Sequence, residues 1–219
     1  DLAGWELAVE VPARFWRAVR LVERNMLQPG QTFVADFDAA AEADEAMGWR
    51  FPVGDAPAPV EGGFRGKALP LDAAVAFEAR HHVFAAAGAV EARLRLAAAS
   101  AGHLVTVDRA RLSLRDGQLA LAVADEAGKW APLAAAKLDL PEEPRWVALK
   151  LSWQAGKVAV SLDGKDVLAA EIAGGLPLKA QARGLGIAEG WRARPKTQTA
   201  KVVFGPVKDA LLDDLTMRR

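Results

Sequence analysis

The sequence predicts an all-β protein built as a sandwich of two antiparallel β-sheets. Apolar and polar residues alternate with period two over many short segments, which is the pattern of half-buried strands. Asp-Gly pairs and other turn residues separate these segments at close spacing. A chain of 219 residues is also long enough to bury the core of such a sandwich as one domain.

The clearest alternation lies in the second half of the chain. From Val147 to Trp153 the odd positions are apolar, and the even ones are Ala, Lys and Ser. Gln154-Ala155-Gly156 predicts a turn, after which Lys157 to Leu162 alternates again. Asp163-Gly164 predicts a tight hairpin, since a primed turn needs residues that accept positive φ. Lys165 to Ile172 is then expected to return as a third strand.

Further strands are expected on both sides of this hairpin. The upstream and C-terminal candidates are Ala89 to Leu96, His103 to Val107, Arg109 to Leu114, Gln118 to Ala124, Gly184 to Ala188, Lys201 to Val207 and Leu211 to Met217. The N-terminal third predicts strands at Glu6 to Val11, Thr32 to Asp38 and Trp49 to Val53, one or two helical turns at Ala39 to Met47, and either a strand or a short helix at Phe15 to Leu27. We expect residues 1–30 to be a separate segment packed on a sandwich formed by residues 31–219.

Charge and composition exclude several function classes. Lys plus Arg and Asp plus Glu both number 28, whereas a nucleic-acid surface is usually basic, so we expect no nucleic-acid partner. Cysteine is absent, which rules out disulfides, thiol catalysis and thiolate metal sites. No apolar run approaches the length of a membrane span, and Asp1 to Trp5 lacks the features of a signal peptide.

Several segments resemble concanavalin A-like, laminin-G-like domains in their order and spacing. Gly66 to Asp72 resembles the family's opening "G-kAl-f-g", and Lys157 to Lys165 resembles its "v-lyvDGk" hairpin, with Ser161-Leu162 in place of the usual aromatic step. Similar correspondences occur at Val75 to Glu78, Gly88 to Arg95, Arg145 to Leu149, Phe37-Asp38 with Gly48-Trp49, and Leu212 to Leu215.

The resemblance covers roughly residues 32 to 217 and implies a concanavalin A-like jelly roll with one concave and one convex sheet. Such domains include sugar binders, adhesion modules, glycoside hydrolases and polysaccharide lyases, so the fold does not decide the function. By this resemblance we also expect Trp49 to be a core residue. A bacterial module that is secreted, periplasmic or on the cell surface is the expected setting.

Catalytic patterns of these enzymes are absent from the sequence. A glycoside hydrolase needs two carboxylates flanking the scissile bond, and no strand carries Glu-x-Asp-x-Glu. Glu42, Asp44 and Glu45 come closest, but they lie in an Ala-rich segment that is not expected to be a strand. The resemblance implies a Tyr/His site for a lyase, and the chain has no Tyr. We therefore expect a binding module and not an enzyme, with a glycoside-active enzyme as the remaining alternative.

Candidate ligand-binding residues are aromatic and charged side chains outside the expected core. Trp146 and Trp153 are expected to be buried, whereas Trp130 and Trp191 lie in turn-rich segments and are candidates for stacking on a sugar ring. The outward row Glu91, Arg93 and Arg95 is expected to line the concave sheet together with Arg111. The alternative is a solvated face with cross-strand ion pairs. The partner is a glycan or, as the second hypothesis, another protein.

A structural calcium ion is the one cofactor that the sequence suggests. Ca²⁺ is bound by carboxylate and carbonyl oxygens. Asp36 or Asp38 and Asp213 or Asp214 would be neighbours if the first and last strands pair, and similar domains often hold calcium near such strands. Alternatively, these are carboxylates of turns and edge strands. His81, His82 and His103 are expected to be loop and strand-edge residues, because two adjacent histidines on a strand face opposite sides.

Overall fold

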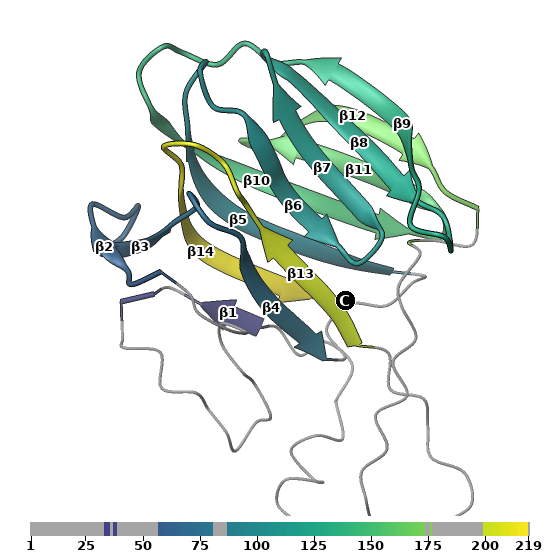
Figure 1. Cartoon of the computed structure of the whole chain (residues 1–219), viewed down its shortest axis with the longest axis horizontal. Coiled ribbons are helices and arrows are strands. Elements are labelled where there is room, and N and C mark those ends of the chain that lie inside the picture. Colours follow the sequence, from purple (N-terminus) through teal and green to yellow (C-terminus); the bar gives the residue numbers. More distant parts are fainter. Residues whose placement is uncertain are drawn as a thin grey trace, which may run out of the picture.

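The described chain folds into two antiparallel sheets that pack face to face, which confirms the expected β-sandwich (Figure 1). The computed structural model describes residues 33–35, 37–38, 57–80, 87–173, 176 and 199–218. All regular elements within these ranges are strands. None of these ranges forms a helix long and apolar enough to cross a membrane. The expected segment 1–30 and the elements predicted at 39–53 and 184–188 lie outside the described residues.

Among the described residues, the larger sheet has eight strands. Its main order runs β12, β11, β10, β5, β14, β3, β2, and β1 also pairs with β14. The bounds of these strands are Phe33–Ala35 (β1), Val60–Glu61 (β2), Lys67–Pro70 (β3), Ala87–Leu96 (β5), Arg145–Gln154 (β10), Lys157–Leu162 (β11), Lys165–Glu171 (β12) and Leu211–Arg218 (β14). Strands β5 and β10 pair over their whole length, from Ala87 with Gln154 to Leu96 with Arg145.

The smaller sheet has six strands in the order β4, β13, β6, β7, β8, β9. Their bounds are Val75–Arg80 (β4), Gly102–Val107 (β6), Ala110–Arg115 (β7), Gln118–Ala124 (β8), Trp130–Lys137 (β9) and Thr199–Phe204 (β13). Strand β13 begins two residues before the predicted Lys201 and ends at Phe204, three residues before the predicted Val207. Both Asp-Gly hairpins have positive φ at each turn residue, as a primed turn requires.

The core lies between the two sheets and consists of the inward-facing residues of the alternating strands. In β7 and β8 these are leucines such as Leu112, Leu119 and Leu121, all fully buried. Phe77 and Phe204 meet edge to face, with ring centroids 6.0 Å apart. Trp153 is 3% exposed, which confirms it as a core residue. The alternate residues of each strand therefore face outward and form the two outer surfaces of the sandwich.

Strand β14 is an interior strand whose second edge is divided between two partners. It pairs with β5 on one side; on the other, Leu211 and Leu212 pair with β3, and Leu215 to Met217 pair with β1. The register of β14 with β5 shifts between Asp213 and Thr216, where β14 passes from one of these partners to the other. This pairing of the first and last strands brings the carboxylates of Asp38 and Asp213 to the same turn, which links β2 to β3.

Candidate functional site

The predicted ligand-binding residues lie on opposite outer faces of the sandwich. Glu91, Arg93 and Arg95 face outward from β5 in the eight-stranded sheet. Arg111 faces outward from β7 in the six-stranded sheet. The expectation that these four residues line one sheet is therefore wrong: β7 pairs with β6 and β8, and never meets β5. The alternation of apolar and polar residues along a strand indicates which side chains face outward, but it does not indicate which sheet the strand joins.

Trp130 and Arg111, which were predicted on separate grounds, contact each other. The guanidinium carbon of Arg111 lies 4.0 Å from the centre of the Trp130 ring system, a cation–π contact. Strand β8 runs between their strands, and Ala122 is the residue of β8 that pairs with Arg111. Because Ala122 has only a methyl group on this face, the indole can reach the guanidinium across it. Trp130 is the first residue of β9 and not part of a turn, which corrects its expected location.

His103 and Ser113 complete this group of outward side chains. His103 on β6 pairs with Ser113 on β7, and His103 Nδ1 lies 3.0 Å from Ser113 Oγ. Ser113 is two residues from Arg111 and thus shares its face. Burial lowers the pKa of His103, and the positive charge of Arg111 lowers it further, so the imidazole is neutral at pH 7. We call these four residues, His103, Arg111, Ser113 and Trp130, the Trp130 face.

Some polar groups of the Trp130 face have no hydrogen-bond partner among the described residues. Arg111 Nε is buried and donates no hydrogen bond to any of the described residues. The hydrogen bond to Ser113 engages only one nitrogen of the His103 ring, which leaves the second nitrogen for another contact. Together the four side chains offer a cation, an aromatic ring, an imidazole and a hydroxyl to a ligand on one strand face.

The opposite face carries a second aromatic and arginine group, the Phe64 cluster of Phe64, Arg93 and Trp146. Phe64 is 39% exposed and meets Trp146 edge to face at 6.1 Å. The Arg93 guanidinium lies 4.4 Å from the centre of the Phe64 ring. Trp146 was expected in the core, and this is wrong. It shares the outward parity of Ala148 and Lys150 on β10 and is only half-buried.

Glu91 belongs to a cross-strand ion triad on the same face. Its Oε1 lies 3.2 Å from Lys150 Nζ on β10 and 2.5 Å from Arg218 Nη2 on β14. Burial alone would raise the pKa of Glu91, but the hydrogen bonds and charges of Lys150 and Arg218 outweigh burial and lower it. Glu91 therefore forms cross-strand ion pairs, as the second interpretation of this outward row predicted. Arg95 faces outward beside Trp146, its partner in register.

Replacing Glu91 by glutamine is expected to lower the free energy of unfolding by about 0.5–1 kcal/mol at pH 7. Because the folded pKa is depressed, this stabilisation is present above the unfolded pKa of about 4.3 and is lost as the pH falls through the folded value. Chemical denaturation of wild type and Glu91→Gln at pH 7 and pH 3 measures the difference. Glu126→Gln, at an exposed turn residue, is the control and should change stability little at either pH. A deficit that grows in acid would contradict the triad.

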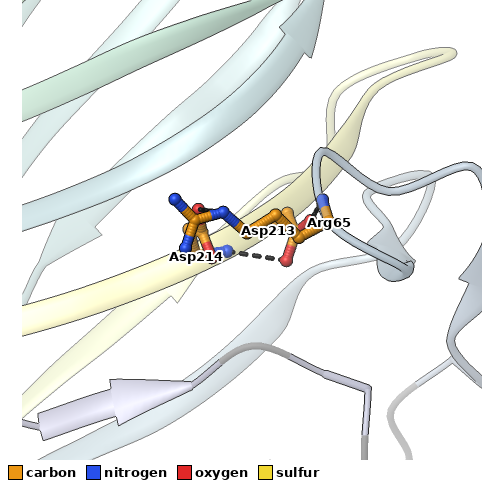
Figure 2. A network of polar contacts seen from close by, with 3 residues as sticks. All are labelled: Arg65, Asp213 and Asp214. Atoms are coloured by element: carbon orange, nitrogen blue, oxygen red, sulfur yellow. Dashed lines mark hydrogen bonds and ion pairs between the residues drawn. The ribbon is translucent and has the colours of Figure 1, made fainter.

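The four aspartates predicted as calcium ligands have different environments. Asp213 Oδ2 accepts the backbone amide of Arg65 at 3.0 Å, and Asp213 Oδ1 accepts that of Asp214 at 2.7 Å (Figure 2). Asp214 Oδ2 lies 3.9 Å from Arg65 Nε. Asp38 Oδ1 accepts the amide of Lys67 at 2.7 Å. Asp36 lies outside the described residues. Two of these carboxylates thus hold the turn between β2 and β3.

These contacts do not form a metal centre in the part of the chain that the structure describes. No three His, Cys, Asp or Glu side chains converge there closely enough to hold an ion. Asp213 is fully buried, and its two oxygens bind backbone amides in place of a cation. The described donors therefore do not fit calcium on their own, and calcium binding stays a prediction.

Several surface residues now stand out that sequence reasoning missed or left untested. Trp191 lies outside the described residues, as do His81 and His82. Phe64 and Ser113 were not singled out, and His103 was expected to be an ordinary strand-edge residue. The only sequence signal for Ser113 was its parity with Arg111 on an alternating strand. Phe64 lies in a turn, where no periodicity indicates the direction of a side chain.

Comparison with known proteins finds similarity in fold alone. No family model matches the chain, and no curated protein matches it. The solved botulinum neurotoxin type G receptor-binding domain aligns at 7% identity with a TM-score of 0.53, covering 87% of this chain and 48% of that one.

Two further solved structures align less closely. The binding domain of Paraclostridial mosquitocidal protein 1 aligns at 12% identity and a TM-score of 0.49, covering 78% of this chain and 43% of that one. The ligand-binding domain of botulinum neurotoxin serotype D, in complex with N-acetylneuraminic acid, aligns at 9% identity and a TM-score of 0.47, covering 86% and 42%. The chain spans less than half the length of these proteins. The likeness to the type G domain, at 7% identity and a TM-score of 0.53, shows a similar fold and nothing more.

Proposed function

We propose that this chain is a non-catalytic binding module that recognises carbohydrate through the Trp130 face. The contact between Trp130 and Arg111 carries the proposal, because it joins an aromatic ring to hydrogen-bond donors on one outer surface. Sugar sites combine an aromatic surface for the ring with polar groups for the hydroxyls. His103 and Ser113 supply further polar atoms beside this contact. We further propose a concanavalin A-like jelly roll in an exported or cell-surface bacterial protein.

The Trp130 face is favoured over the Phe64 cluster because its polar groups are less satisfied. On the eight-stranded sheet, Glu91 is held by two cations and Arg93 lies against Phe64. On the six-stranded sheet, Arg111 forms no ion pair with a described residue and its Nε has no hydrogen bond. A group whose partners lie within the protein has less interaction free energy left for a ligand.

A catalytic role has less support in the described part of the chain. Glu91 and Asp213, on the neighbouring strands β5 and β14, are carboxyl groups with a shifted pKa. A glycoside hydrolase needs one carboxyl as acid and another that reaches the sugar or a water. Asp213 is fully buried with both oxygens bound to backbone amides, and Glu91 is held by Lys150 and Arg218. Neither side chain is placed to receive a substrate.

A glycan array tests the proposal with wild type and Trp130→Ala. We expect wild type to bind a subset of saccharides and Trp130→Ala to lose about tenfold or more in affinity, equivalent to about 1.4 kcal/mol. Trp146→Ala removes the same side chain from the opposite face and should bind as wild type does.

A wild-type chain that binds no saccharide and forms a stable oligomer by light scattering would favour the assembly alternative. In that case the exposed Phe64 cluster is the surface to which a protein partner would bind. Equal losses in Trp130→Ala and Trp146→Ala would also contradict the assigned face, because they would indicate a general effect of losing an indole.

A further inference from the structure

We propose that the saccharide bound by the Trp130 face carries a carboxylate, and that Arg111 is the residue that selects it. This inference rests on the proposed function and adds the chemical class of the ligand. It follows from a contrast among the described arginines. Arg65, Arg145 and Arg218 lie beside carboxylates, whereas Arg111 is half-buried, has no acidic partner among the described residues, and has a buried Nε without a hydrogen bond.

Three other arginines on the described surface lie beside carboxylates. Arg145 Nη1 lies 2.9 Å from Asp163 Oδ2, and Arg218 binds Glu91. Arg65 lies beside Asp214, with 3.9 Å between Nε and Oδ2. In each of these pairs the guanidinium lies beside a carboxylate from another segment of the chain. The described chain provides the same cation at Arg111 without the balancing anion.

The cation–π contact with Trp130 does not replace that anion. An indole ring stabilises the charge of a guanidinium, but it supplies no oxygen to accept the N–H groups. Arg111 Nε is therefore a buried donor without an acceptor, and such a group costs free energy until a partner is present. A planar guanidinium forms its strongest hydrogen bonds with a carboxylate, two at a time. A ligand carboxylate is thus the group that Arg111 lacks.

The surroundings of Arg111 favour recognition of one carboxylate, on a single sugar unit of the ligand. His103 is neutral at pH 7 and so adds no second positive charge. Its hydrogen bond with Ser113 places polar atoms suited to sugar hydroxyls on the same face. The outward residue of β8 that pairs with Arg111 is Ala122, whose small side chain does not obstruct access from above. The chain as a whole has no net charge, so attraction must be local to this site.

The test compares carboxylated polysaccharides with their neutral esters. Polygalacturonate, alginate and hyaluronan are each titrated calorimetrically against the protein beside the methyl ester of the same polymer, at about 0.15 M salt. We expect at least one acid form to bind tenfold or more tightly than its ester. Arg111→Gln should abolish that preference. Lys157→Gln removes one positive charge from an exposed position on the other sheet and should preserve it.

The outcomes separate this inference from the proposed function. If neutral saccharides bind in a Trp130-dependent manner and acid and ester bind alike, carbohydrate recognition stands and carboxylate selection is wrong. Equal losses in Arg111→Gln and Lys157→Gln would overturn the inference as well, because they indicate general charge attraction. If no polysaccharide binds in any form, both proposals fail. Circular dichroism of each variant checks that a loss of binding is not a loss of fold.

Discussion

Replacing Trp153 by alanine is expected to lower the free energy of unfolding by about 3–5 kcal/mol. Trp153 is 3% exposed and lies on β10 within the core between the sheets. Removing its indole leaves a cavity that surrounding residues fill only in part, so both transfer free energy and packing are lost. Urea denaturation measures the difference. Trp130→Ala, the same change at a half-buried outer position, should cost less than about 1 kcal/mol. Equal losses at both positions would contradict this assignment of the core.

Gly88 provides a second check, because the Trp153 ring occupies the space beside it. The two residues pair across β5 and β10, and a Cβ at Gly88 would lie 2.5 Å from Trp153 Cζ2. Gly88→Ala should therefore destabilise the protein by about 1–3 kcal/mol. In the Trp153→Leu background the same substitution should cost less, since a smaller side chain removes the clash. Additive losses in this double-mutant cycle would show that the two positions are independent.

Replacing Asp213 by asparagine is expected to cost about 1–3 kcal/mol of unfolding free energy at neutral pH. Its two oxygens accept the amides of Arg65 and Asp214, and an asparagine keeps only one acceptor oxygen. The amino group that replaces the second oxygen would face another N–H donor. Asp214→Asn is the control, because its ion pair with the exposed Arg65 is long and asparagine tolerates the positive φ found there. That variant should lose less than about 0.5 kcal/mol.

The pH dependence at Asp213 should have the opposite sign to that at Glu91. Burial raises the pKa of Asp213, although hydrogen bonds from backbone amides partly oppose this. A folded pKa above the unfolded value of about 3.9 means that the folded state holds the proton more tightly. Stability from this group therefore increases as the pH falls through the folded pKa. The advantage of wild type over Asp213→Asn should increase in that range, and a decrease would contradict the buried environment.

Strands were predicted where alternation and turn chemistry agree. Lys157–Leu162 and Gln118–Ala124 have the predicted bounds, because each lies beside an Asp-Gly turn that fixes its register. Strand β9 was missed. It is an edge strand in which half of the residues are Ala and position 132 is a proline, so it shows no period of two. An edge strand pairs on one side only, and its sequence can therefore show less alternation of apolar and polar residues than that of an interior strand.

The candidate site could be predicted only in part, because a sequence gives the direction of a side chain along a strand but not its neighbour across strands. Arg111 and Trp130 were both identified, yet their contact depends on β8 lying between β7 and β9. Trp146 shows the other difficulty. Its parity with Lys150 indicated an outward position, but tryptophan is apolar enough to suggest burial. Here the strand period was the better guide than residue type.

The interior position of β14 has a consequence for the order in which the protein can be completed during synthesis. Strand β5 and the hairpin-connected strands β10, β11 and β12 are all synthesised before β14. Until β14 emerges, one edge of β5 exposes its unpaired backbone groups, and β1 and β3 have no strand to join them to the sheet. The nascent chain must keep this edge from pairing with other chains while β6 to β13 are made. Strand β14 therefore completes the eight-stranded sheet by pairing with β5 in its interior. Strands β1 and β3 can join the sheet only after β14 has been synthesised.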